Sequence, residues 1–337
     1  MQQMQEEVSP DLFWRTMTAF QNSAALKTAV ELDLFTAIDN GNHDPASIAK
    51  ATNASERGVR ILADTMTVIG FLEKNGGYSL TPSTRAFLSR NSQTFVGSAV
   101  EFIMSPTQRR GYDDLTNAVK NGGSQVHGEA SLDPESPMWV TFARAMMPMM
   151  FPAAQAIAAQ IDAPADEPIK VLDIAAGHGI FGIVVAQRFP KAEIFALDWP
   201  NVLQVATENA QRFGVADRHH LIPGSAFEAE VGQGYDVVLM TNFLHHFDAD
   251  TCTELLKKVN RALAPDGQVM TLEFVPNEDR ISPPAEALFS LVMLAATPAG
   301  DAYTYPELQQ IYEAAGFTKN EIIALEPMPQ HLLISKK

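Results

Sequence analysis

The sequence predicts a helical N-terminal domain followed by an α/β domain built on a doubly wound, seven-stranded, mostly parallel sheet. Three observations lead to this prediction. Apolar residues recur at helical spacing in the first half, short apolar strands alternate with helices in the second half, and an acid- and proline-rich segment at 162–168 separates the halves. A chain of 337 residues is long enough for two domains. We therefore place the domains at residues 1–164 and 165–337.

The first 80 residues have the element order of a winged helix. Residues 11–39 carry apolar side chains at helical spacing, Asp44-Pro45 begins another helix, and Ser55 begins a third. Residues 71–80 predict two short strands around Asn75-Gly76. DNA binding would need a basic surface, whereas the chain has 24 basic and 40 acidic residues, a net charge of −16. We therefore expect a packing module that forms a homodimer, and we keep a DNA-binding regulator only as an alternative.

Residues 95–160 predict further helices, which are rich in methionine and aromatic residues between positions 138 and 151. Most of these side chains are expected in the core or in a dimer interface. Because methionine adapts its shape, some of them are expected to line a pocket for a flat apolar substrate.

The second half alternates strands and helices, so its strands are expected to run mainly in parallel with helices on both faces. The last two strands are joined by a short link, which favours an antiparallel hairpin at one edge. Ligands of such sheets bind at the carboxyl ends of the strands. The expected strands are 169–174, 193–197, 220–222, 235–240, 268–274, 319–325 and 330–335. One expected helix follows the first strand and ends near residue 189, and the others are 202–213, 250–263, 285–296 and 305–315. A turn is expected at Pro265-Asp266-Gly267, after the helix at 250–263.

A glycine-rich loop follows the first of these strands. Gly177-x-Gly179-x-x-Gly182 lies between a strand and a helix, as in dinucleotide-binding proteins, and Asp198 ends the next strand. Asp173 separates two cofactor classes. Its carboxylate would repel a pyrophosphate, whereas the sulfonium and ammonium groups of S-adenosylmethionine would be attracted. We expect S-adenosylmethionine, with S-adenosylhomocysteine as product; an NAD-dependent oxidoreductase remains an alternative.

Several ordered segments resemble a known family, the class I methyltransferases of the plant caffeic-acid and bacterial polyketide O-methyltransferase type. They are 171–179, Ala196-Leu197-Asp198-Trp199-Pro200, Gly224-Ser225-Ala226-Phe227, 241–247, Leu272-Glu273 and Ala314-Ala315-Gly316-Phe317. The resemblance covers nearly the whole chain. It implies an N-terminal winged-helix dimerisation and substrate-lid domain, a Rossmann-like methyltransferase domain, and O-methylation of a small aromatic or polyketide-like metabolite.

The resemblance also implies a cofactor site. The methionine part and the ribose would lie against Asp173, Ala175, Gly177 and Gly179, and Asp198 would hold the ribose hydroxyls. Trp199 would pack on the adenine, and the adenine wall would be formed by Gly224, Ser225, Ala226 and Phe227. Thr241 and Asn242 would approach the cofactor. Many relatives have aspartate where Ser225 stands, so the hydrogen bond to adenine is expected to differ here.

The turn after the strand at 235–240 contains His245 and His246. Methylation of a phenol requires loss of the hydroxyl proton, and histidine is suited to general-base catalysis because it titrates near neutral pH. The family pattern makes His245 the base and places His246 where aspartate is usual. Glu273 ends the next strand, where it can accept the other N–H of the imidazole and fix its tautomer. A histidine that merely packs the turn is the alternative role.

Other features of the sequence limit this assignment. Asp248 and Asp250 could join the two histidines as metal ligands, but adjacent histidines seldom face one ion and Asp250 is expected to cap the next helix, so we expect no metal. The plant enzymes have a second glutamate where Ala302 stands, which leaves C- or N-methylation open and makes the Tyr303 hydroxyl a substitute candidate. The expected substrate-binding residues are Phe102, Met104, Phe142, Met146, Met150, His246, Phe289 and Met293.

A cytoplasmic protein is expected. Cys252 is the one cysteine, which excludes an internal disulfide framework, and we assign it no role. No run of about 18 apolar residues predicts a membrane span. The opening residues MQQMQEEVSP lack the basic and apolar regions of a signal peptide.

Overall fold

The structure is a computed structural model that describes residues 8–125, 135–164 and 166–337. Residues 1–7, the stretch 126–134 within the predicted helical region, and residue 165 of the predicted separating segment lie outside the described residues. The chain divides into two compact units, residues 1–100 and 101–337, and each is described by itself. The functional division at residue 165 remains a prediction.

The first unit has the predicted winged-helix order. It contains α1 (Asp11–Glu31), α2 (Leu34–Asp39), α3 (Pro45–Ala51), α4 (Glu56–Val68), the hairpin β1 (Leu72–Lys74) and β2 (Tyr78–Leu80), and α5 (Pro82–Leu88). The caps predicted at α3 and α4 are present: Asp44 accepts hydrogen bonds from Ala46 and Ser47, and Ser55 accepts one from Gly58.

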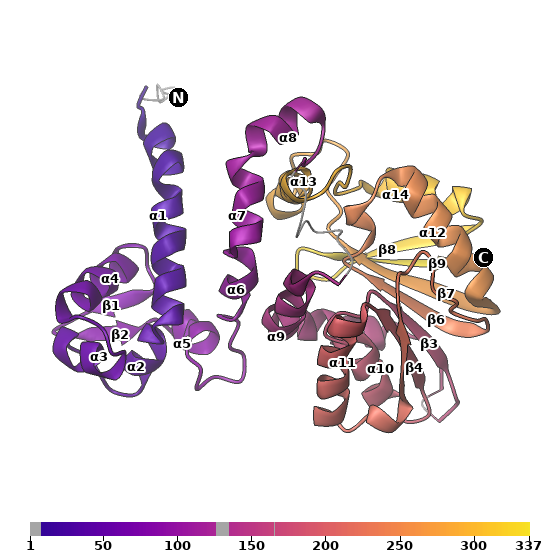
Figure 1. Cartoon of the computed structure of the whole chain (residues 1–337), viewed down its shortest axis with the longest axis horizontal. Coiled ribbons are helices and arrows are strands. Elements are labelled where there is room, and N and C mark those ends of the chain that lie inside the picture. Colours follow the sequence, from indigo (N-terminus) through magenta and orange to yellow (C-terminus); the bar gives the residue numbers. More distant parts are fainter. Residues whose placement is uncertain (1–7, 126–134, 165) are drawn as a thin grey trace, which may run out of the picture. The chain divides into compact units, whose positions relative to one another are not determined.

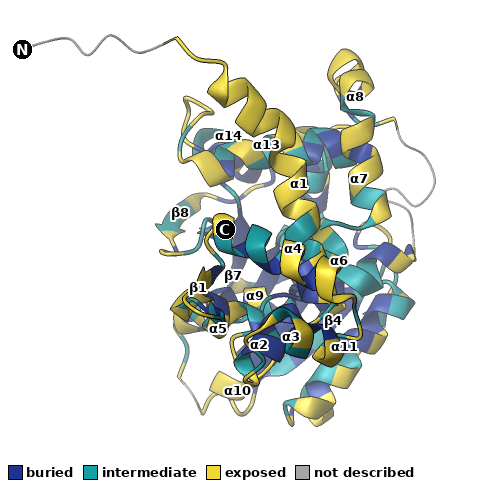
Figure 2. Cartoon of the chain, turned by 90° about the vertical axis from the view of Figure 1, so that its left-hand side faces the viewer, coloured by how far each residue is buried: buried dark blue, intermediate teal, exposed yellow. Residues whose placement is uncertain are grey.

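The helix predicted at 11–39 is two helices. The chain breaks at Asp33, whose φ of 54° is left-handed, and α2 restarts in a new direction to bury Leu34, Phe35 and Ile38. The N-terminal part of α1 is exposed instead of buried, as Figure 2 shows. Hydrophobic periodicity therefore predicted helical structure over these residues, but not the break at Asp33 or which apolar side chains are buried.

The second unit begins with helical segments that precede its sheet. They are α7 (Pro106–Asp113), α8 (Leu115–Asn121) and α9 (Pro137–Ala159), with α6 (Ala99–Ile103) at the boundary between the units. The helix α9 packs against α10 (Ile180–Arg188) and α11 (Pro200–Arg212) and buries Met146 and Met150. The methionine-rich stretch thus lies on one helix, which belongs to the same unit as the sheet.

The sheet of the second unit has seven strands in the order β5-β4-β3-β6-β7-β9-β8 within the described residues (Figure 1). Its strands are β3 (Lys170–Ile174), β4 (Glu193–Asp198), β5 (His219–Pro223), β6 (Tyr235–Thr241), β7 (Leu263–Glu273), β8 (Lys319–Ala324) and β9 (His331–Lys336). The first five in sequence are parallel, and β8 and β9 form the predicted antiparallel edge hairpin. The predicted doubly wound sheet is confirmed.

Helices cover both faces of this sheet. On one face, Ala196 of β4 packs with Leu203 of α11. On the other, α12 (Ala249–Ala262) and α14 (Tyr305–Ala314) bury Leu172 and Leu197 in one continuous core. The helix α13 (Pro284–Ala296) lies after β7. None of the helices in the described ranges is long and apolar enough to cross a membrane.

Two local predictions in this unit are wrong. The stretch Pro265-Asp266-Gly267 is no turn but lies within β7, where the register with β6 shifts between Tyr235 and Val237. A Cβ at Gly267 would lie 2.6 Å from the Tyr235 carbonyl oxygen, so glycine permits this close strand approach. The cap of α12 is Asp248, which accepts a 2.8 Å hydrogen bond from the Thr251 N–H, and Asp250 lies in the first turn.

Candidate active site

The loop between β3 and α10 has an unusual backbone. Ala175, Gly177 and Gly179 all have left-handed φ angles, of 54°, 58° and 73°. Gly179 also lies close to α11, since a Cβ there would be 3.0 Å from that of Ala206. Ala175 adopts this conformation at a cost of about 1 kcal/mol relative to a right-handed residue. Together these residues turn the chain back at the carboxyl end of β3, where ligands of this fold class bind.

Asp173 lies under this loop and is fully buried. One carboxylate oxygen, Oδ2, accepts a 3.1 Å hydrogen bond from the Gly182 N–H, and the other, Oδ1, is buried without a partner in the described residues. Burial raises the pKa of Asp173 to about 7, although the Gly182 hydrogen bond opposes the shift and the charge of Asp198 adds to it. An unpartnered buried carboxylate oxygen favours a cationic ligand and disfavours a pyrophosphate.

Asp198, at the end of β4, holds the neighbouring loops together. Its carboxylate accepts hydrogen bonds from the N–H groups of Gly177 at 2.8 Å and Trp199 at 2.7 Å, and its carbonyl accepts one from Gly224 at 2.9 Å. Burial raises the pKa of Asp198 to about 6 against the effect of these hydrogen bonds. The structure thus brings together three segments that the resemblance assigned to the cofactor.

The expected adenine residues lie around this point. The Ser225 hydroxyl accepts a 3.2 Å hydrogen bond from the Phe227 N–H, and the half-exposed Phe227 ring packs edge-on against Phe247. Ala226 is buried. Trp199 packs against an apolar cluster that joins α11 to Trp139 of α9.

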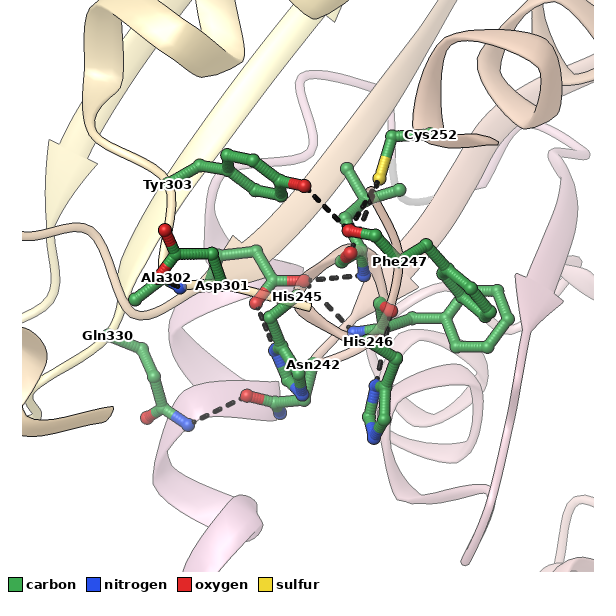
Figure 3. A network of polar contacts seen from close by, with 12 residues as sticks. Asn242, His245, His246, Phe247, Cys252, Asp301, Ala302, Tyr303 and Gln330 are labelled. Atoms are coloured by element: carbon green, nitrogen blue, oxygen red, sulfur yellow. Dashed lines mark hydrogen bonds and ion pairs between the residues drawn. The ribbon is translucent and has the colours of Figure 1, made fainter. Parts of the chain in front are cut away.

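The turn after β6 presents the two histidines. The strand β6 ends at the buried Thr241. Asn242 then takes a left-handed φ of 54°, and a short 3-10 helix follows at Leu244–His246. Figure 3 shows the polar residues that surround this turn. The left-handed residue redirects the chain across the carboxyl edge of the sheet, which places His245 beside the end of β7.

His245 and Glu273 form a buried hydrogen-bonded pair. The Nδ1 atom of His245 lies 2.5 Å from Oε2 of Glu273, and both side chains are about 95% buried. The other carboxylate oxygen, Oε1, accepts hydrogen bonds from the N–H groups of Phe243 at 2.9 Å and Leu244 at 2.8 Å. Because two backbone donors fix the carboxylate, it orients the ring in turn: Nδ1–H donates to Glu273, which leaves Nε2 of the neutral imidazole as the acceptor.

His246 has a different environment. Its Nδ1–H donates to the Phe243 carbonyl oxygen at 3.2 Å, and its ring centroid lies 4.3 Å from that of His245 and 5.5 Å from that of Trp139. Burial lowers the pKa of His246 well below its ordinary value, and the proximity of His245 adds to this effect. His246 is therefore a neutral, aromatic wall beside His245.

The segment before α14 packs directly on this turn. A Cβ at Gly300 would lie 2.2 Å from the His245 carbonyl oxygen, and Ala302 is fully buried. The Tyr303 hydroxyl donates to the Phe247 carbonyl oxygen at 2.6 Å, so its proton is already engaged. The Cys252 thiol donates to the Leu244 carbonyl oxygen at 3.3 Å, which gives it a structural role at this turn.

Aromatic and methionine side chains line the surroundings of His245. Phe289 of α13 packs edge-on against His245 at 4.9 Å and stacks on Phe274 at 3.9 Å. Phe102 packs on Phe142 at 5.0 Å, and Phe142 in turn on Trp139 at 5.9 Å. Met146, Met150 and Met293 are buried, Met104 is half-buried, and Asn242 contacts the Met150 sulfur at 3.7 Å.

Four residues of this region were not predicted as site residues. Trp139 and Phe274 extend the aromatic wall, the buried ring of His178 stacks on Phe142 at 6.5 Å, and Gln330 donates to Asn242 at 3.1 Å. Trp139 lies in the methionine-rich stretch and His178 in the glycine loop, so both had a positional signal. Gln330 had none, because the pairing of β9 with β7 brings it here.

No group of three or more histidine, cysteine or acidic side chains within the described ranges is arranged to hold a metal ion.

Comparison with known proteins defines the family. A family model for the O-methyltransferase domain matches residues 112–318, and one for the O-methyltransferase dimerisation domain matches residues 14–90. The chain belongs to the O-methyltransferase family. Family membership confirms the predicted S-adenosylmethionine-dependent methyltransferase and removes the oxidoreductase and the DNA-binding regulator as alternatives.

Three relatives of this O-methyltransferase illustrate the match. A crystal structure of a protein from Nostoc punctiforme PCC 73102, assigned as an O-methyltransferase, is 50% identical and has a TM-score of 0.94, covering 98% of this chain and 100% of that one. The tetracenomycin polyketide synthesis 8-O-methyl transferase of Streptomyces glaucescens is 26% identical over 97% of this chain and 96% of its own. Human N-acetylserotonin methyltransferase, solved in complex with SAM, is 21% identical with a TM-score of 0.84, covering 100% of this chain and 99% of that one, and so supports the fold.

Proposed function

We propose that this O-methyltransferase methylates the hydroxyl of a small aromatic or polyketide-like acceptor, with His245 as general base and Glu273 as its positioning residue. The observation that supports this proposal most is the buried 2.5 Å contact between His245 Nδ1 and Glu273 Oε2, which leaves Nε2 free to accept a proton. The tetracenomycin relative, a polyketide O-methyl transferase by name, supports the acceptor class.

The residues at the carboxyl ends of β3 and β4 fit S-adenosylmethionine. When bound, this cofactor supplies the electrophilic methyl group. The unpartnered Oδ1 of Asp173 suits its cationic groups, and Gly177 and Gly179 in the loop above it carry no side chain that would obstruct a ligand. Asp198 holds this loop against Gly224 and would bind the ribose, with Trp199, Ser225, Ala226 and Phe227 towards the adenine and Thr241 and Asn242 towards the methionine part.

The chain's own residues then perform the proton transfer. His245 Nε2 accepts the proton of the acceptor hydroxyl, and Glu273 stabilises the imidazolium that results. The aromatic wall of Phe289, His246 and Trp139 orients a flat acceptor and excludes water from the base. With Ala302 in place of a second glutamate, one carboxylate orients the base.

We expect the affinity for S-adenosylmethionine to rise with pH, by about tenfold or more between pH 5.5 and 7.5. Burial raises the pKa of Asp173 in the empty site to about 7, so the carboxyl group is protonated at pH 5.5, where a cationic ligand must displace the proton, and is mostly ionised at pH 7.5. Titration calorimetry measures this dependence.

The variant Asp173→Asn cannot ionise at this position and is expected to bind more weakly with a flatter pH profile. The exposed Asp266→Asn serves as the control, with an unchanged profile. Equal pH dependence in wild type and Asp173→Asn would contradict the assigned role of Asp173.

We also propose that the N-terminal unit forms a homodimer through α1. Phe13, Met17 and Phe20 recur at i, i+4 and i+7 on one side of α1 and are 57%, 57% and 67% exposed. An exposed apolar stripe of this kind marks an association surface, and the matched dimerisation domain, residues 14–90, includes Met17 and Phe20.

Replacing Phe13, Met17 and Phe20 together with serine is expected to convert the dimer to a monomer at micromolar concentration, as measured by light scattering. The exposed Val119→Ser, on α8 of the second unit, is expected to leave the dimer intact. A triple variant that stays dimeric would place the interface elsewhere.

A further inference from the structure

A buried carboxylate near the base has no assigned role. Glu286, in the first turn of α13, is 6% exposed. Within residues 8–125, 135–164 and 166–337 it accepts no hydrogen bond and forms no ion pair with lysine or arginine. Its carboxylate oxygens are not among the unpartnered side-chain atoms that are sealed from solvent, so a ligand can reach them. A carboxylate that accepts no hydrogen bond from the described residues is available to a donor that the chain itself does not supply.

The helix directs Glu286 to the acceptor side of the site. Glu286, Phe289 and Met293 follow one another at helical spacing, so they share one face of α13. Phe289 on this face packs 4.9 Å from the His245 ring, and Met293 is 4% exposed. The carboxylate of Glu286 thus lies one helical turn from the residue that contacts the base.

A second unpartnered polar group faces the same place. His331 begins β9 opposite Glu273 of β7, and its Nδ1 atom is buried without a hydrogen bond in the described residues. Burial lowers the pKa of His331, and the nearby charge of Glu286 partly offsets this shift. A neutral imidazole forms no ion pair, so Glu286 and His331 do not neutralise each other.

The neighbouring polar groups, by contrast, are satisfied. Gln330 is 5% exposed and donates to Asn242 Oδ1 at 3.1 Å, as Figure 3 shows. Arg280 is engaged with Asp301 and Glu307 on the exposed side. In the described residues, the polar side chains near the base that lack a hydrogen-bond partner are therefore Glu286 and His331. A carboxylate that accepts hydrogen bonds, beside a neutral imidazole, suits a ligand that donates hydrogen bonds.

We propose that Glu286 and His331 bind a second hydrogen-bond donor on the aromatic acceptor, a hydroxyl or an amino group, while His245 takes the proton from the hydroxyl to be methylated. This inference rests on the proposed function. It narrows the acceptor from any phenol to dihydroxy- or aminohydroxyarenes. An acceptor without the second donor leaves the buried groups unpaired, which is a strong basis for discrimination.

Matched acceptors test this proposal. The three dihydroxybenzene isomers and the three aminophenols are compared with phenol, and dihydroxynaphthalenes with naphthol, by transfer of labelled methyl from S-adenosylmethionine. The full-length wild-type enzyme is expected to show a kcat/KM at least about tenfold higher for the best donor-bearing member of a set than for its monohydroxy analogue.

The variants Glu286→Leu and Glu286→Gln are expected to lose this preference through a higher KM for the donor-bearing acceptor, so that the ratio of kcat/KM for the donor-bearing acceptor to that for its monohydroxy analogue falls towards one. Glu278→Gln, the same substitution at an exposed carboxylate, is the control and is expected to keep the preference. The Gln variant retains the side-chain shape, so it reports on the charge even if the Leu variant folds poorly.

Two results would overturn the inference and leave the proposed function standing: equal kcat/KM for donor-bearing and monohydroxy acceptors in the wild type, or an equal loss for both acceptors in the Glu286 variants. Absence of wild-type turnover with every member, although S-adenosylhomocysteine binds, would remove the proposed function and this inference with it.

Discussion

Replacing His245 with alanine is expected to lower the rate of methyl transfer by about 10²–10⁴-fold, the range typical of general-base removal. The ring is buried, its Nδ1–H is held by Glu273, and its Nε2 is free to accept the proton of the acceptor. Within the described residues this ring contacts Glu273, His246 and Phe289, none of which is assigned to the cofactor, so binding of S-adenosylhomocysteine should be unchanged. Steady-state turnover and titration calorimetry on the same preparation measure the two effects.

The control for this variant is His220→Ala. His220 is a half-exposed histidine that pairs with Glu193 on β4, away from the turn. It should retain full turnover. Wild-type turnover in His245→Ala would eliminate His245 as the base, and a parallel loss of cofactor binding would mean that the ring supports the fold of the site.

Replacing Glu273 with glutamine is expected to cost about 10²–10⁴-fold in kcat with little change in stability. The amide oxygen can still accept the N–H groups of Phe243 and Leu244, which leaves the amide NH₂ facing His245 Nδ1. The ring must then turn to the other tautomer, with its lone pair on Nδ1 and its proton on Nε2. Loss of the carboxylate in the Ser-His-Asp triad has an effect of this size for the same reason.

The two Glu273 variants separate positioning from folding. Glu273→Ala leaves two backbone N–H groups unpaired and should also lower the free energy of unfolding, by about 1–3 kcal/mol for each group. Nitrogen-15 spectra of the imidazole report the tautomer directly. A Glu273→Gln enzyme with an unchanged tautomer and unchanged kcat would show that this carboxylate only packs the turn.

Much of the site region could be predicted because its chemistry is local in sequence. The glycine loop, Asp198, the histidine turn and Glu273 each lie at the carboxyl end of a strand, and parallel strands bring these ends to one edge. The proximity of His245 to Glu273 follows from the pairing of β6 with β7. The roles assigned to these residues remain proposals that the variants above test.

Other features depended on long-range contacts that a sequence does not display. The break at Asp33 follows from the burial of Leu34 and Phe35, and the course of β7 through Pro265–Gly267 follows from its register with β6. Gln330 and His331 reach the site only because β9 inserts between β7 and β8. Glu286 looks like an ordinary first-turn acid of a helix until its burial is known.

The central claim is that His245 removes the acceptor proton, and the pH dependence of the His245→Ala rate tests it most directly. Without the base, only an acceptor that is already ionised can react, so kcat should rise about tenfold per pH unit between pH 7 and 9, below the pKa of a phenol near 10. The wild-type rate should change far less over this range. Parallel pH profiles for the two enzymes would contradict the claim.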